Sequence, residues 1–230
     1  LLRRDILRRA HDRIGRHGNW WAGAGFSFAL AFQIFSGYPQ IVFYTLIAVS
    51  IFWLVVCWGV KNFYKKSILL FLSAFLGVGI SAIQILPAYE LISLSQRKYE
   101  EIPLEWIFLS WQQVITFVAP DFFGNHATGN YWGPKNYTSV VGFIGVVSMI
   151  FSTYSIFFWK KRKEVKFLIW ILIFSLLLAL PNPISIFLLQ TNVMGVQAGV
   201  FIRSLVLFTF SASLLTALGI NYFLKKEKAS

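Results

Sequence analysis

Six long apolar stretches dominate this sequence, and the segments between them are strongly basic at every second connection. Each stretch is close to the roughly 20 residues that an α-helix needs to cross about 30 Å of hydrocarbon. The stretches are Gly18–Phe35, Ile41–Val60, Ser67–Leu86, Val140–Trp159, Lys163–Leu180 and Ser204–Leu224. The pattern predicts an all-α, polytopic bundle of about six transmembrane helices.

The distribution of basic residues predicts the orientation of this bundle. Seventeen of the 21 lysines and arginines fall in the segments that share a side with the N-terminus. The other four, Arg97, Lys98, Lys135 and Arg203, fall on the opposite side. Cytoplasmic connections of membrane proteins carry an excess of lysine and arginine. We therefore expect a multi-pass protein of the cytoplasmic membrane with both ends of this chain cytoplasmic.

The net charge of +12 does not indicate a nucleic-acid partner. The chain is 57% hydrophobic and only 13% charged, whereas soluble domains average about 25% charged residues. Its basic residues lie at the edges of the apolar stretches, where they meet anionic lipid head groups. The expected partner of the chain is the lipid bilayer, with no nucleic acid.

The expected organisation alternates membrane and surface segments. Residues 1–17 form a basic cytoplasmic segment, either an interfacial helix or a loop that follows an upstream span. Three spans occupy 18–86, an external segment occupies 87–139, and three further spans occupy 140–224 with an external loop at 181–203. Residues 225–230 form a cytoplasmic tail. Because the chain does not begin with methionine, we expect it to be a fragment of a larger membrane domain.

The 53-residue external segment contains an amphipathic pattern. Ile107, Trp111, Val114 and Val118 recur at helical spacing. Another face carries Glu105, Gln112, Gln113 and Thr116. The pattern predicts a helix along the outer membrane surface that ends at Pro120.

The chemically densest part of the chain follows, from Pro120 to Tyr137. Glycines and prolines predict a shaped loop, and aromatic side chains alternate with polar ones. Sugars need this mixture, because they present hydroxyl edges and apolar C–H faces. The alternative is an ordered external loop whose aromatic residues anchor it at the interface. The candidate substrate-binding residues here are Asp121, Asn125, His126, Tyr131, Trp132, Lys135 and Tyr137.

Two charged residues outside this loop are further candidates. Glu90, three residues after Pro87, lies at the outer end of the third stretch and is either solvated or faces a ligand. Arg203 stands where the last stretch begins on the external side. It either reaches a lipid phosphate or holds the phosphate of a lipid-linked substrate.

The sequence lacks the motifs of nucleotide binding, of a clear metal site and of an activated nucleophile. There is no phosphate-binding glycine loop and no dinucleotide fingerprint. The histidines are too scattered to predict a metal site, although Asp121 and His126 with a third ligand from elsewhere would form one. No nucleophile stands beside a base in a distinctive pattern.

Three motifs together resemble the YfhO-type family of bacterial membrane proteins. They are Gly37-Tyr38-Pro39-Gln40, Gln84-Ile85-Leu86-Pro87 followed by Glu90 and Arg97, and Pro120-Asp121-Phe122-Phe123-Gly124-Asn125 leading to Tyr131-Trp132-Gly133. That family is similar to the C-type (GT-C) glycosyltransferases. The resemblance implies a GT-C-like fold and a bacterial enzyme that transfers a sugar from a polyprenyl-phosphate carrier to a cell-envelope glycopolymer or lipid acceptor.

The resemblance also implies roles for individual residues. Trp132, Tyr131 and Tyr137 would stack on the sugar, Asp121 and Asn125 would bind its hydroxyls, and Lys135 or Arg203 would bind the carrier phosphate. The catalytic carboxylate of such enzymes usually lies in the first external loop, as a base or a metal ligand. Here the first external connection, Ser36–Gln40, has no carboxylate. The catalytic residue therefore stays unknown, and a divalent metal remains possible only in the full-length protein.

Two non-enzymatic functions remain open. A carrier or flippase for lipid-linked sugars should have polar residues at the bilayer midplane, in interrupted helices. The most polar residues near the middle of the predicted spans are Ser27, Ser73, Ser81 and Ser211, which disfavours a hydrophilic path. The other alternative is a structural membrane subunit without a substrate.

Overall fold

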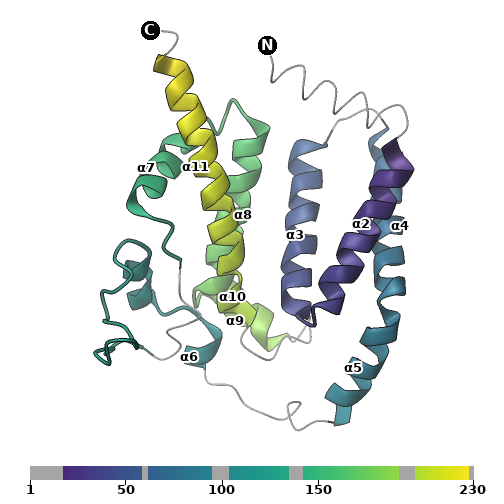
Figure 1. The fold of residues 1–230 in the computed structure, drawn as a ribbon, viewed down its shortest axis with the longest axis horizontal. Helices are drawn as coiled ribbons and strands as arrows, with labels where there is room; N and C mark the ends of the chain where they lie inside the picture. Colours follow the sequence, from purple (N-terminus) through teal and green to yellow (C-terminus); the bar gives the residue numbers. More distant parts are fainter. Residues whose placement is uncertain (1–17, 59–61, 95–103, 135–141, 192–199, 228–230) are drawn as a thin grey trace. The chain divides into compact units, whose positions relative to one another are not determined.

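The computed structural model describes residues 18–58, 62–94, 104–134, 142–191 and 200–227. Within these ranges the regular elements are helical and no strand is present, which confirms the predicted all-α class (Figure 1). The chain forms two compact units, one of residues 1–45 and 57–100 and the other of residues 46–56 and 101–230. The two units are described separately below.

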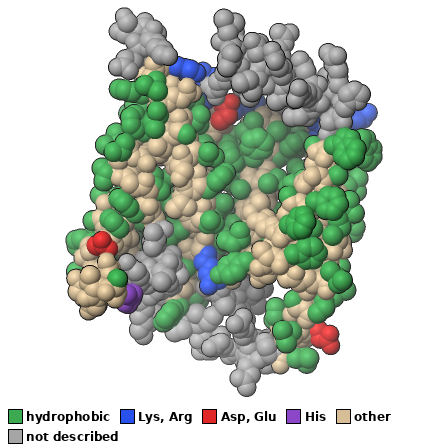
Figure 2. Space-filling view, in the orientation of Figure 1, with side chains coloured by type: hydrophobic (Ala, Val, Ile, Leu, Met, Phe, Trp, Pro, Cys, Tyr) green, Lys and Arg blue, Asp and Glu red, His purple; other side chains and the backbone are tan. Residues whose placement is uncertain are grey.

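The helices are compatible with a membrane, but fewer are full spans than the sequence predicted. In the described ranges, α3 (Pro39–Val56), α4 (Phe63–Ile80) and the segment Phe201–Lys225 are long and apolar enough to cross a bilayer. A fourth span results if the bent pair α8 (Lys163–Ala179) and α9 (Pro183–Gln190) is counted as one. Only 11% of α3 and of α4 is buried, and apolar side chains cover the visible helix surfaces (Figure 2). The length and composition of these helices indicate a membrane protein, with three to four candidate spans among the described residues.

The first unit is held together by close packing of α2 (Gly18–Phe35) and α4. The two helices run parallel, because Gly23 meets Leu69 and Leu30 meets Gly77. The Ser27 hydroxyl donates to the Ser73 carbonyl oxygen at 2.7 Å. A Cβ added at Gly77 would lie 2.8 Å from the Ser27 carbonyl oxygen. Small residues thus bring the two backbones together, as expected for helices that associate in lipid.

The reversal between α2 and α3 follows the sequence prediction. α2 ends at Phe35 and Pro39 begins α3, while Gly37 adopts a φ of 77°, which favours glycine. Across the hairpin, the Gln33 side-chain amide donates to the Thr45 hydroxyl at 2.7 Å.

The next helical segment differs from the prediction. α4 ends at Ile80, and α5 (Ala82–Leu94) continues beyond Ser81 with Pro87 inside it. The expectation that the helix ends at Leu86 is therefore wrong. Proline removes a single intrahelical hydrogen bond, and the helix tolerates that loss here.

The second unit is built around α11 (Leu205–Glu227), which packs against α7 (Val146–Ile156) and α8 (Figure 1). Gly219 allows α7 to approach closely, because a Cβ at this position would overlap the carbonyl oxygen of Phe151. The Thr216 hydroxyl donates to the Ser148 carbonyl oxygen at 2.9 Å on the same side of α11. α7 is 11 residues long, shorter than the span predicted over Val140–Trp159.

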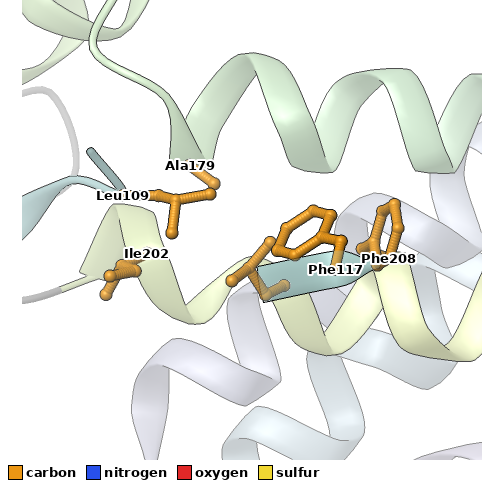
Figure 3. Close-up of a cluster of buried hydrophobic side chains, with 6 residues drawn as sticks. Leu109, Phe117, Ala179, Ile202 and Phe208 are labelled. Carbon is orange, nitrogen blue, oxygen red and sulfur yellow. The ribbon is translucent and has the colours of Figure 1, made fainter. Parts of the chain in front are cut away.

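A buried apolar cluster joins the end of α8 and the start of α11 to the segment that precedes the polar loop. It consists of Leu109, Phe117, Ala179, Ile202, Leu205 and Phe208 (Figure 3). The Leu109 amide donates to the Ala179 carbonyl oxygen at 2.7 Å. Nearby, the hydroxyls of Ser175 and Ser204 each donate to the other residue's carbonyl oxygen, at 2.6 and 2.8 Å. These contacts fix the start of α11 against the end of α8.

The bend between α8 and α9 measures 66° and occurs where Pro181 and Pro183 flank Asn182. The Asn182 side chain donates to the carbonyl oxygens of Leu177 and Leu180. Its Oδ1 accepts from the amides of Ile184 and Ser185 at the start of α9. The predicted end of the fifth stretch at Leu180 is confirmed, because Leu180 is the C-cap of α8. Asn182 satisfies the backbone groups that the bend exposes.

Candidate functional site

The segment from Pro120 to Tyr137 is called the candidate loop below. Two short helices, rather than one, precede it. α6 covers Leu104–Ile107, and the 3-10 helix η2 covers Trp111–Phe117. Between them, Ser110 caps η2 through a capping box, because its side chain accepts from the Gln113 amide while Gln113 Oε1 accepts from the Ser110 amide. The predicted continuous amphipathic helix is therefore wrong.

Two residues of the predicted polar face are not exposed either, although Gln112 is. Gln113 and Thr116 are buried, whereas Trp111 and Val118 are exposed. A 3-10 helix has three residues per turn, so residues three apart lie on one face. Gln113 and Thr116 are aligned in this way, and the Thr116 hydroxyl donates to the Gln113 carbonyl oxygen at 2.7 Å.

Phe117 anchors the beginning and the end of the candidate loop. Its ring lies 4.8 Å from that of Phe208 on α11, centroid to centroid (Figure 3). Gly142, which follows the loop in the sequence, packs on the same ring, since a Cβ there would lie 2.5 Å from Phe117 Cε1. The loop therefore projects from a buried aromatic contact.

Inside the loop, Asn125, Thr128 and Asn130 form a polar knot. Asn130 Oδ1 accepts from the Asn125 amide at 3.0 Å and from the Thr128 hydroxyl at 2.6 Å. Asn125 Oδ1 accepts from the Thr128 amide at 3.1 Å. Gly124 has a φ of 75°, and a Cβ there would overlap the Asn130 carbonyl oxygen. The knot thus fixes the loop backbone and commits the Oδ1 atoms of both asparagines to it.

Beside the polar knot lies an aromatic cluster. Phe123 is buried, and its ring contacts the Trp132 ring edge to face at a centroid distance of 4.9 Å. The Trp132 amide also donates to the Phe123 carbonyl oxygen at 3.0 Å. The Trp132 side chain is nevertheless 67% exposed, and the neighbouring Phe122 is 51% exposed. One flat indole face is thereby held in a fixed position with much of its surface open.

The remaining loop residues flank this surface. The His126 and Tyr131 rings lie 4.7 Å apart, and the Tyr131 hydroxyl donates to the Pro134 carbonyl oxygen. Asp121 is exposed at the entry to the loop, where its carbonyl oxygen accepts from the Gly124 amide at 2.9 Å. The loop therefore brings together five of the predicted site residues.

Arg203 lies in the same unit, at the C-terminal end of the short helix α10 (Val200–Arg203). Its neighbours Ile202 and Ser204 are fully buried, whereas Arg203 itself is partly exposed. Ile202 belongs to the apolar cluster that holds Phe117. The residue before Arg203 and a residue that leads into the candidate loop therefore pack in the same apolar cluster.

The other predicted site residues are not part of this arrangement. Lys135 and Tyr137 lie outside the described residues. Glu90 is exposed on α5 and belongs to the first unit. Among the described residues no three histidine, cysteine, aspartate or glutamate side chains are grouped to hold a metal ion, so Asp121 and His126 gain no third ligand there.

Three contributing residues were not among the predicted site residues. Phe122 widens the exposed aromatic surface, and Thr128 and Asn130 form the polar knot. The Asn125-His126-Ala127-Thr128-Gly129 sequence contains the signal for a side-chain-stabilised turn, because asparagine oxygens accept from backbone amides a few residues on.

Comparison with known proteins found no matching family model, no similar curated protein and no similar solved structure.

Proposed function

We propose that this chain is part of a bacterial membrane glycosyltransferase that takes a sugar from a polyprenyl-phosphate carrier and attaches it to a cell-envelope acceptor. In this proposal the chain is a GT-C-like bundle of about six spans with both ends cytoplasmic. The candidate loop then faces the outside of the cytoplasmic membrane.

The observation that carries the proposal is the exposed Trp132 ring on an ordered loop. The polar knot and the Phe123 contact position the indole before any ligand arrives. Preorganised aromatic faces bind the apolar side of a sugar ring at little entropic cost. The exposed Asp121 carboxylate and the Asn125 Nδ2 group supply an acceptor and a donor for sugar hydroxyls.

Arg203 provides the complementary group for the carrier phosphate. Its guanidinium has the planar donor fork that binds phosphate oxygens in pairs. It lies beside the buried residues of α10 and α11, near the N-terminal end of the candidate membrane span Phe201–Lys225. A lipid-linked phosphate needs a cation at such a boundary, because its tail lies in hydrocarbon and its charge does not.

The chemistry assigned to these residues is binding and electrostatic stabilisation. When the sugar leaves, negative charge builds on the carrier phosphate, and a fixed guanidinium lowers the energy of that state. The catalytic base is not assigned to a described residue.

The Arg203→Gln variant tests this assignment. We expect it to weaken binding of polyprenyl phosphate and of polyprenyl-phosphate hexose equally, because both carry the phosphate. The loss of a charge-assisted hydrogen bond, about 2 kcal/mol, corresponds to roughly thirtyfold weaker binding. Titration of the purified full-length protein in detergent micelles, followed by native mass spectrometry, measures both affinities.

Two controls accompany this test. Arg203→Lys keeps the charge without the fork and should give an intermediate affinity. Lys65→Gln removes a cation from the start of α4 and should leave both affinities unchanged. Equal binding by Arg203→Gln and the unaltered protein would remove Arg203 from the phosphate site.

A lipid-linked-sugar carrier is the second candidate, and the bend between α8 and α9 favours it, because interrupted helices line the substrate sites of transporters. Such sites use backbone groups left open by the interruption. Here Asn182 and Ser185 bind those groups internally. The enzyme proposal is therefore preferred.

A further inference from the structure

A dense group of cations lies in the second unit, where α7 leads into α8 and where α11 ends. Three lie in the turn between α7 and α8, two lie in the first turn of α8, and a sixth lies at the C-terminal end of the candidate span that α11 forms. We call these residues the basic collar; they are Lys160, Lys161, Arg162, Lys163, Lys166 and Lys225. All six are exposed. Glu164 is the only acidic residue between Phe157 and Lys166, so the turn keeps a strong net positive charge.

Packing brings the two parts of the basic collar to the same end of the unit. Val165 at the start of α8 and Tyr222 near the end of α11 belong to one buried cluster, with Leu168 and Leu215 beneath them. The Arg162 guanidinium carbon lies 5.9 Å from the centre of the Tyr222 ring. The charges of α8 and α11 therefore act on one local surface.

Aromatic rings hold part of the basic collar at an apolar boundary. Trp159 and Trp170 lie 5.9 Å apart, and the Lys166 ammonium lies 6.0 Å from the centre of the Trp159 ring. Tryptophan and tyrosine beside lysine and arginine are typical of the layer in which lipid head groups lie. Within the described residues the buried Tyr222 hydroxyl has no hydrogen-bond partner.

We propose that the basic collar is a binding site for anionic phospholipid head groups. α8 and α11 are candidate membrane helices that begin and end at the collar, so its cations lie where the hydrocarbon meets the head groups. An anionic phosphodiester gains favourable Coulomb energy from several cations at once. A zwitterionic head group gains less, because its own ammonium opposes that attraction.

Lipid titration of the full chain tests this site. The purified protein in detergent is titrated with phosphatidylglycerol or phosphatidylcholine of identical acyl chains, and bound lipids are counted by native mass spectrometry. We expect phosphatidylglycerol to bind about tenfold more tightly. The double variant Lys160→Gln, Lys163→Gln should abolish this preference, since each cation near a membrane surface contributes about fivefold.

Matched variants separate local binding from folding and from total charge. Lys65→Gln with Lys66→Gln removes two cations from the first unit and should retain the preference. Glu164→Gln removes the single acid of the turn and should strengthen phosphatidylglycerol binding, which an unfolded variant would not do. Equal binding of the two lipids, or an equal loss in both double variants, would overturn the proposal. Because it does not involve the loop or Arg203, its failure would leave the proposed function unaffected.

Discussion

Replacement of Trp132 by alanine should weaken binding of polyprenyl-phosphate hexose about tenfold and leave binding of polyprenyl phosphate unchanged. The reason is that the indole is 67% exposed yet fixed by its ring contact and backbone hydrogen bond with Phe123. A sugar stacked on this ring removes apolar surface from water, and a gain of about 1.4 kcal/mol corresponds to a factor of ten. The two probes share the prenyl chain and the phosphorus, so the change that the variant makes in the ratio of their affinities isolates the contribution of the sugar.

Two variants control for damage to the loop. Trp132→Phe keeps a flat ring and should recover most of the binding. Trp111→Ala removes a comparably exposed tryptophan, 62% exposed on η2, and should change neither affinity. If Trp132→Ala binds the sugar-bearing probe as well as the unaltered protein does, the loop is an interfacial anchor and not a sugar site.

The Gly219→Ala variant should lose about 2 kcal/mol of stability. A Cβ at this position would overlap the Phe151 carbonyl oxygen, which belongs to the backbone of α7 and cannot move away as a side chain can. Overpacking of this kind typically costs about 1–3 kcal/mol. It would also strain the nearby hydrogen bond from Thr216 to Ser148. Chemical denaturation in detergent micelles, followed by tryptophan fluorescence, measures the effect.

The matched control is Gly79→Ala on α4. Apart from the nearby backbone of α4 itself, no atom lies within 4 Å of the position that its Cβ would occupy. Alanine is a better helix former than glycine by up to about 1 kcal/mol, so this variant should be neutral or slightly more stable. Similar stability of the Gly219→Ala and Gly79→Ala variants would show that α7 and α11 do not pack as described.

Hydropathy predicted the bounds of a helix well where residues next in the sequence, such as glycine and proline, end it. The bounds of α2 match the predicted Gly18–Phe35, and Gly37 and Pro39 form the turn that their backbone preferences favour. The prediction failed where contacts between residues far apart in the sequence determine whether a segment is helical. The Leu109 amide bonds to the Ala179 carbonyl oxygen, and this long-range bond interrupts the helix expected across Ile107–Val118.

The number of spans depends on features that hydropathy does not record. α7 begins only at Val146, after Gly145 with a φ of 90°, although the apolar sequence starts earlier. A run of apolar residues shows that a segment avoids water, but not that its backbone is helical throughout. The six predicted spans therefore remain a prediction beside the three to four candidate spans described.

The location of the candidate site was predictable, but the state of its polar groups was not. Aromatic, polar and glycine residues between Pro120 and Tyr137 predicted a shaped loop. Which asparagine oxygens are committed to the polar knot depends on the φ of Gly124 and on contacts that only the folded loop makes. The exposure of the Trp132 side chain likewise depends on the folded loop, because Phe123 is the buried ring of this pair and Trp132 is the exposed one.

The most direct test of the proposed function is transfer of sugar by the full-length protein in proteoliposomes. The vesicles contain radiolabelled polyprenyl-phosphate hexose, and a crude bacterial cell-envelope fraction supplies the acceptor. We predict that label moves from the lipid carrier into covalent linkage with envelope material, and that Trp132→Ala reduces the rate. Label that stays on the carrier, whether or not the carrier crosses the bilayer, would contradict the account.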